Sequence, residues 1–185
     1  MTGPRLRAFL ALDLDPSAHE RLRGLIESLR GTVAGIRWVR PEGLHLTLRF
    51  LGATEEERAR RVAGRVEAAA AATPAATLEL GGLGMFPERG APRVLWVGLA
   101  LPPPLRALQE ACEQAARAEG FAAEERAYAP HLTLGRWSER ARRPALPASA
   151  LGAVRLERLV LYRSQTQAGG SVYTPLRTLA LGGLG

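Results

Sequence analysis

The sequence predicts a mixed fold of α-helices and β-strands, and three observations support this prediction. The tetrapeptide His-Leu-Thr-Leu occurs twice, at residues 45–48 and 131–134, each time in a short apolar segment typical of a β-strand. Segments with apolar residues at helical spacing alternate with further strand-like segments. The chain closes with two strand-like segments that flank glycines 169 and 170, which indicates a β-hairpin. With 185 residues, 46% of them hydrophobic, the chain can bury one ordinary core.

The first half of the chain is expected to contain two strands and two helices. Residues 5–13 are apolar and weakly alternating, as in a strand, and Asp15, Pro16 and Ser17 then give a helix-start signal. The helix is supported by apolar residues at helical spacing, namely Leu22, Leu25, Ile26 and Leu29. After a turn at 41–43, residues 44–51 form the strand of the first motif. Thr54, with Glu57 at capping-box spacing, is expected to begin a helix that reaches about residue 72.

The second half repeats this composition of strands and a helix. Prolines 102–104 open a helix that ends near Gly120. The expected strands are residues 78–83, 93–99, 130–136, 154–162 and 172–180. The two motif strands thus belong to halves of similar size, and His45 and His131 lie 86 positions apart. Apart from the tetrapeptide the halves share little identity, so a structural repeat is a hypothesis.

Each motif places a histidine and a threonine on the same face of its strand. Alternate side chains of a strand share a face, so His45 and Thr47 point one way, and the leucines between them point the other. His131 and Thr133 repeat the pattern. If the two strands lie side by side, two imidazoles and two hydroxyls line one cleft. His19, among charged neighbours in the first helix, is expected at the surface.

The remaining composition excludes several kinds of protein. The single cysteine, Cys112, rules out an internal disulfide and a thiolate metal cluster, and its phase with Leu105 and Leu108 predicts a core position. No segment has the length and apolarity of a membrane-spanning helix or the architecture of a signal peptide, so we expect a cytoplasmic protein.

The charge leaves two interpretations open. The net charge of +7 comes from 25 basic residues, all arginine, which suits an anionic partner such as a nucleic acid. The absence of lysine, together with abundant alanine, glycine and proline, equally fits the codon bias of a GC-rich genome.

The two motifs and several other segments resemble the 2H phosphoesterase superfamily, which is defined by two HxTx motifs. Within it, the chain is similar to the RNA 2′,3′-cyclic phosphodiesterases, also called 2′-5′ RNA ligases. The resemblance covers nearly the whole chain. Besides the motifs it includes residues 9–12, 50–52 and 92–98, and a tail with Ser164, Gly170, Tyr173 and Leu176. Thr166 and Ala168 depart from the family pattern, in which leucine and proline are common at these places.

The resemblance implies a particular arrangement of the α+β fold. It implies a bilobal, pseudo-twofold structure in which two antiparallel sheets line a central cleft and the helices pack outside. Residues 1–185 would form a single 2H phosphoesterase domain of two intertwined lobes.

The resemblance also implies hydrolysis of RNA 2′,3′-cyclic phosphate ends to 2′-phosphates by the paired histidines. His45 would be the general acid for the 3′ oxygen and His131 the general base for water, although the residues alone do not decide which is which. Thr47 and Thr133 would donate hydrogen bonds to the phosphate oxygens. Arg136 would bind the phosphate through its guanidinium if the strand ends or bulges there, and Arg49, in phase with His45, is a rival phosphate contact.

Aromatic residues near these segments are candidates for stacking on the terminal base. They are Phe50, Trp137 and Tyr173. Trp38 and Trp96 are equally compatible with the core.

The partner expected from the resemblance is RNA with a 2′,3′-cyclic phosphate end, such as a tRNA fragment, bound by a monomer. Reverse 2′-5′ ligation would use the same groups, and relatives act on other cyclic or 2′-5′ nucleotides. A non-catalytic single-stranded RNA-binding module is the alternative outside the enzymes. The motif histidines lack the neighbouring carboxylate or third imidazole of a typical metal site, and no Walker-type loop is present, so neither metal nor cofactor is expected.

Overall fold

The computed structural model describes residues 5–148, 150–168 and 170–182. They contain both helices and strands, and the named strands pair antiparallel, which confirms the α+β class. The helices are α1 (Pro16–Leu29), the short 3-10 helix η1 (Pro41–Gly43), α2 (Glu56–Arg65), α3 (Glu67–Ala72) and α4 (Pro103–Ala118). The strands are β1 (Arg5–Leu14), β2 (Ile36–Trp38), β3 (His45–Glu55), β4 (Ala76–Phe86), β5 (Val94–Leu99), β6 (His131–Trp137), β7 (Ala153–Gln167) and β8 (Gly170–Ala180).

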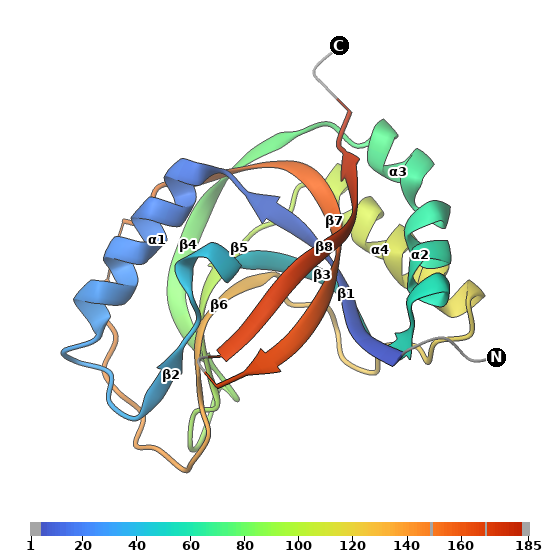
Figure 1. Ribbon diagram of the computed structural model, residues 1–185. Helices are drawn as coiled ribbons and strands as arrows, with labels where there is room; N and C mark the ends of the chain where they lie inside the picture. Colours follow the sequence, from blue (N-terminus) through green and yellow to red (C-terminus); the bar gives the residue numbers. More distant parts are fainter. Residues whose placement is uncertain (1–4, 149, 169, 183–185) are drawn as a thin grey trace.

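The strands form two antiparallel halves that are joined along both edges. One half has the order β3-β1-β7-β8, and the other has β2-β6-β5-β4 (Figure 1). The halves meet where Leu46 of β3 pairs with Leu132 of β6, and where β4 pairs with the start of β7. The two sheets implied by the resemblance are therefore continuous, because strand pairing leads from β1 through the second half and back to β1.

The helices lie outside the sheet. Helices α2, α3 and α4 gather on one side of the molecule, beyond β1 and β3, whereas α1 lies apart from them (Figure 1). Helix α1 begins as its sequence predicts: the carboxylate of Asp15 accepts the backbone N–H of Ala18 at 2.9 Å, and Pro16 occupies the first turn. The same carboxylate accepts the backbone N–H of Arg155 at 2.7 Å, so it also ties the helix to β7.

The prediction that Thr54 caps a helix is wrong. Strand β3 continues to Glu55, because Thr54 pairs with Leu6 in the β1–β3 ladder and is buried there. The helix begins at Glu56 without a side-chain cap and is interrupted at Val66, which divides it into α2 and α3. The capping-box pattern is local, whereas the partner that extends β3 lies nearly fifty residues away in the chain.

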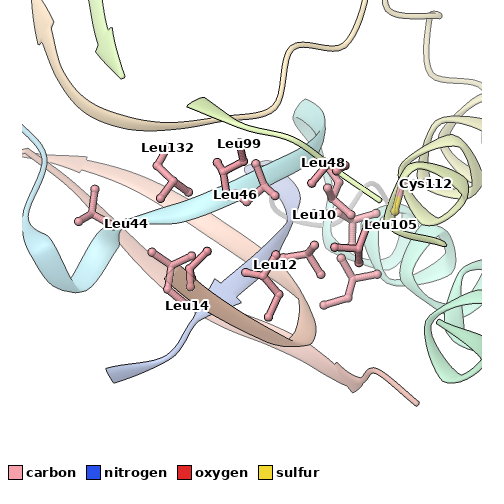
Figure 2. Close-up of a cluster of buried hydrophobic side chains, with 14 of the residues drawn as sticks. Leu10, Leu12, Leu14, Leu44, Leu46, Leu48, Leu99, Leu105, Cys112 and Leu132 are labelled. Atoms are coloured by element: carbon pink, nitrogen blue, oxygen red, sulfur yellow. The ribbon is translucent and has the colours of Figure 1, made fainter. Parts of the chain in front are cut away.

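The core is built from the leucine faces of the motif strands. Figure 2 shows Leu46 and Leu132 in one cluster with Leu10 and Leu12 of β1 and with Leu105 of α4. Cys112 lies in this core as expected, and burial raises the pKa of its thiol to about 12, so it stays protonated at neutral pH. Burial of both leucine faces leaves the opposite faces of the two motif strands to form the cleft.

Two further sequence expectations concern the end of the chain and the membrane. Strands β7 and β8 form the expected antiparallel pair; Gly170 begins β8, and Gly169 lies outside the described residues. In the part of the chain that the structure describes, no helix is long and apolar enough to cross a membrane.

Candidate functional site

The two His-Leu-Thr-Leu motifs lie side by side at the centre of the molecule. Leu46 and Leu132 are antiparallel partners, so this register sets Thr133 across from His45 and His131 across from Thr47. All four polar side chains line one cleft of about 500 Å³. The leucine pair thus lies at the centre of a pseudo-twofold arrangement that presents a histidine and a threonine from each motif.

Each histidine ring is oriented by the same local hydrogen bond. The Nδ1 atom of His45 lies 2.7 Å from the carbonyl oxygen of Gly43, and that of His131 lies 2.7 Å from the carbonyl oxygen of Ala129. A carbonyl oxygen only accepts, so Nδ1 donates in both rings. The remaining nitrogen, Nε2, is then the atom that gives or takes a proton on each side.

Burial favours the neutral form of both rings. Burial lowers the pKa of His45 to about 4, and hydrogen bonding to Gly43 together with the Asp13 charge only partly opposes this effect. Burial also lowers the pKa of His131, with the Arg136 charge acting in the same direction. An anion bound between the rings would raise both pKa values, because it stabilises imidazolium.

Aromatic side chains enclose both imidazoles. Phe9 stacks on His45 with ring centroids 4.6 Å apart, and Tyr173 meets the same ring edge-on at 5.0 Å. Phe86 meets His131 edge-on at 5.1 Å. Sequence reasoning did not assign these roles to Phe9 and Phe86. Phe9 was noted only as part of the first apolar strand and of the family-like segment 9–12, and neither observation reveals that β3 lies beside it.

A β-bulge turns Arg136 into the cleft. Strict alternation from His131 would put Arg136 on the leucine face. However, Trp96 pairs with Thr133 whereas Leu95 pairs with Gly135, so Leu134 is an extra residue and the alternation shifts by one position. Arg136 consequently lines the cleft with an exposed side chain. The condition that the sequence set for an Arg136 contact is therefore met.

The first motif contains a bulge at the same place, which removes Arg49 from the cleft. Ala11 pairs with Thr47 whereas Leu10 pairs with Arg49, so Leu48 is the extra residue. Arg49 is 5% exposed and forms ion pairs of 2.6 Å with Glu113 and with Glu124. The hypothesis that Arg49 contacts phosphate is therefore wrong. Phe50 takes the position equivalent to Arg136 and lines the cleft.

The three stacking candidates are placed differently. Phe50, which is 52% exposed, and Tyr173 both line the cleft. Trp137 does not: its indole is 4% exposed and its Nε1–H donates to the carbonyl oxygen of Ala34 at 3.0 Å. The bulge that turns Arg136 toward the cleft turns the next side chain into the core. Trp137 is thus withdrawn as a candidate for stacking on the terminal base.

The sequence did not predict that two further residues line the cleft, and it placed His19 at the surface. Arg7 and Ser164, ladder partners on β1 and β7, bring another guanidinium and a hydroxyl to the cleft. His19 is half-buried rather than simply exposed, because its Nδ1 lies 2.7 Å from the carbonyl oxygen of Pro41 in η1. Among the described residues, no three His, Cys, Asp or Glu side chains are grouped so as to hold a metal ion.

Comparison with known proteins agrees with this geometry. The profile of the 2′-5′ RNA ligase superfamily matches residues 14–168. An RNA 2′,3′-cyclic phosphodiesterase of Methanothermobacter thermautotrophicus is 30% identical over 184 residues, covering 96% of this chain and all of that protein. The structure of TT0787 from Thermus thermophilus superposes with a TM-score of 0.81 at 29% identity, covering 96% and 99% of the two chains.

A ligand complex is also among the similar structures. Escherichia coli LigT complexed with 3′-AMP superposes with a TM-score of 0.77 at 28% identity, covering 96% of this chain and 99% of LigT. The family profile spans most of the chain, and the archaeal relative aligns over nearly the full length of both proteins. The chain therefore belongs to the 2′-5′ RNA ligase superfamily of 2H phosphoesterases.

Proposed function

We propose that this protein is an RNA 2′,3′-cyclic phosphodiesterase that opens the cyclic phosphate at an RNA 3′ end and leaves a 2′-phosphate. The observation that carries the proposal is the pair of imidazoles in one cleft, each with Nδ1 held by a backbone carbonyl. The names of the relatives support the same substrate class.

The paired rings suit the two proton transfers of the reaction. One Nε2 takes the proton of the attacking water while the other protonates the departing 3′ oxygen on the far side of phosphorus. We assign the acid to His45 and the base to His131. Atoms balance: the hydroxyl of water bonds to phosphorus as the bond from phosphorus to the 3′ oxygen breaks. The proton of water goes to His131, and the proton that His45 gives up goes to the 3′ oxygen.

The other cleft residues would stabilise the negative charge that builds up on the phosphate. Thr47 and Thr133 donate their hydroxyl hydrogens to the non-bridging oxygens, and Arg136 adds its planar set of donors. The phosphate anion also raises the pKa of His45, which allows this buried ring to carry the acid proton in the complex. No step of this mechanism requires a metal ion.

The same groups would support the reverse reaction. If a 5′-hydroxyl of RNA takes the place of water, the proton transfers run through the same rings and join the ends by a 2′-5′ bond. We expect hydrolysis as the net activity, because water greatly outnumbers RNA 5′ ends. We also expect a monomer acting in the cytoplasm, and sedimentation equilibrium tests its oligomeric state.

The decisive experiment incubates the purified protein with an oligoribonucleotide bearing a 2′,3′-cyclic phosphate, with a chelator present. We expect a 2′-phosphate product, and both His45→Ala and His131→Ala should lower kcat by about 10²- to 10⁴-fold. His19→Gln, which removes the third imidazole but keeps a donor for Pro41, is the matched control and should retain activity.

Other outcomes would redirect the proposal. A 3′-phosphate product would reverse the assigned leaving oxygen, and a strict metal requirement would contradict the mechanism. RNA binding without turnover by the wild-type protein would favour the non-catalytic RNA-binding module. Turnover confined to a different cyclic or 2′-5′ nucleotide would reassign the substrate within the same superfamily.

A further inference from the structure

Two grooves lead away from the catalytic cleft, and they differ in charge. The basic groove, of about 300 Å³, is lined by Arg37, Trp38, Arg40 and Arg136 and shares Ser171 and Tyr173 with the cleft. Its arginines come from β2, from the residues that follow it and from the end of β6. None of the residues that line it is a carboxylate. The groove therefore extends the cleft, and the only charged side chains in its lining are positive.

The second groove, here the mixed groove, starts from His45 and Tyr173 on the other side of η1. Its three arginines, of which Arg40 also lines the basic groove, face an equal number of carboxylates, Asp13, Glu20 and Glu42. Arg23 pairs with Glu42 at 2.7 Å and Arg158 pairs with Asp13 at 3.1 Å. Its charges are therefore largely neutralised, and a polyanion gains little by entering it.

The arginines of the basic groove also differ from three of the four arginines on α2. On α2, Arg60, Arg61 and Arg65 are held by glutamates at 2.6–2.8 Å. Within residues 5–148, 150–168 and 170–182, no carboxylate lies within ion-pair distance of Arg37, Arg40 or Arg136. Their charges are thus available to an external anion, whereas those on α2 are satisfied within the molecule.

From these differences we propose that the basic groove binds the single-stranded RNA immediately 5′ of the nucleotide that carries the cyclic phosphate. This inference rests on the proposed function. A cyclic phosphate lies at an RNA 3′ end, so the rest of the strand extends from the cleft in the 5′ direction with one negative charge per nucleotide. Of the two grooves, only the basic one offers those phosphates positive charge with no carboxylate in its lining.

The lining of the basic groove suits nucleotides as well as phosphates. Trp38 is half-buried, with the guanidinium of Arg30 6.0 Å from its ring centroid, and its indole offers a stacking surface for a base. Beyond Ser138 the surface is hollowed again, by about 880 Å³, and this hollow is lined by Arg140, Arg142 and Arg143 with a single carboxylate, that of Glu139. The basic track is therefore longer than one nucleotide, which favours an oligonucleotide over a mononucleotide.

The test compares two substrates across matched double variants. Arg37→Gln/Arg40→Gln removes two charges from the basic groove, and Arg106→Gln/Arg117→Gln removes two charges from exposed positions of α4, on the opposite side of the molecule (Figure 1). The substrates are 2′,3′-cyclic AMP and a ten-nucleotide single-stranded RNA ending in a 2′,3′-cyclic phosphate. For each protein, kcat/KM is measured at several salt concentrations.

We expect the groove variant to lower the ratio of kcat/KM for the decamer to that for 2′,3′-cyclic AMP by at least about tenfold. Its slope of log kcat/KM against log salt for the decamer should be shallower by about 1.4, which corresponds to two lost phosphate contacts. The α4 variant should keep the wild-type ratio. An unchanged ratio in the groove variant, or an equal fall in both variants, would overturn the proposal.

A binding measurement separates this inference from the proposed function. Fluorescence anisotropy with a labelled decamer ending in a 3′-phosphate reports the groove without any chemistry. If the wild-type protein opens neither cyclic substrate, the proposed function fails. The groove assignment then stands if the groove variant weakens decamer binding by at least about tenfold relative to the α4 variant, and it fails if the two variants bind equally.

Discussion

At the scale of single residues, the site is defined by the two imidazoles, in each of which the backbone binds Nδ1 and leaves Nε2 free. Gly43 and Ala129 hold the two Nδ1 atoms, each only two residues before its histidine, so the orientation of each ring is a local property of its motif. The protonation of the rings is not local. It depends on burial by Phe9, Tyr173 and Phe86, which come from three other strands, and on Arg136.

These shifts predict an acidic pH optimum for kcat/KM. One ring must be protonated and the other neutral, and kcat/KM reports the free enzyme. With the pKa of His45 lowered to about 4 and that of His131 lowered from its usual 6.5, the active population peaks between them. Activity should therefore be bell-shaped, with a maximum below pH 6.5, in assays from pH 4 to 8.

The Arg136→Gln variant sharpens this prediction. The positive charge of Arg136 lowers the pKa of both rings, so its removal should move the alkaline limb of the profile to higher pH while reducing kcat/KM. A wild-type optimum above pH 7, or an alkaline limb that does not move in the variant, would contradict the assignment of that limb to the histidines.

At the scale of elements, the two bulges decide which side chains accompany the motifs. Both strands alternate regularly from histidine to threonine and then insert one residue, Leu48 or Leu134. The residue after next consequently faces the cleft, as Phe50 does in β3 and Arg136 does in β6. Arg49 was misassigned for this reason, because a period of two applied along the strand fails wherever the partner strand leaves a residue unpaired. Trp137 was a candidate because it is near the motif in sequence, and the second bulge turns it into the core.

At the same scale, we predict that the stability of the protein depends on the residue that caps helix α1. Asp15 caps the helix and also accepts from the backbone of β7, so Asp15→Ala should lower the free energy of unfolding by about 2 kcal/mol. Burial alone would raise the pKa of Asp15, but hydrogen bonds from Ser17, Arg155 and Ala18 outweigh it and lower this pKa to about 2. Asp15→Asn has one acceptor oxygen, which can keep the bond to Ala18 but not the bond to Arg155, so it should lose less than Asp15→Ala in urea titrations at pH 7. Equal losses in the two variants would refute the capping role.

At the scale of the whole molecule, the continuous sheet brings together residues that are far apart in the chain. The pairing of Leu46 with Leu132 joins the two halves at the cleft, and the contact of β4 with β7 joins them at the opposite edge. Arg49 stabilises the first half on the side away from the cleft. It links β3 to Glu113 of α4 and to Glu124 in the loop that precedes β6.

Replacing Arg49 therefore tests a structural role against the catalytic role that its sequence position suggests. Arg49→Leu leaves two partly exposed carboxylates without their partner and should lower the free energy of unfolding by about 1.5–3 kcal/mol. Arg61→Leu removes an exposed arginine from Glu119, which stays paired with Arg65; it is the control and should cost at most about 1 kcal/mol. Urea unfolding measures both. A stable Arg49→Leu protein with a strongly raised KM would instead restore Arg49 as a phosphate contact.

The sequence by itself determined what depends on near neighbours. The repeated tetrapeptide specified two strands with a histidine and a threonine on one face, Asp15 and Pro16 specified the start of α1, and helical spacing placed Cys112 in the core. Only the tertiary structure decided which residues beyond the motifs reach the cleft and which arginines keep an uncompensated charge. Bulges, buried ion pairs and grooves arise from contacts between segments far apart in the chain, and no pattern within a single segment records the residue that will lie opposite it.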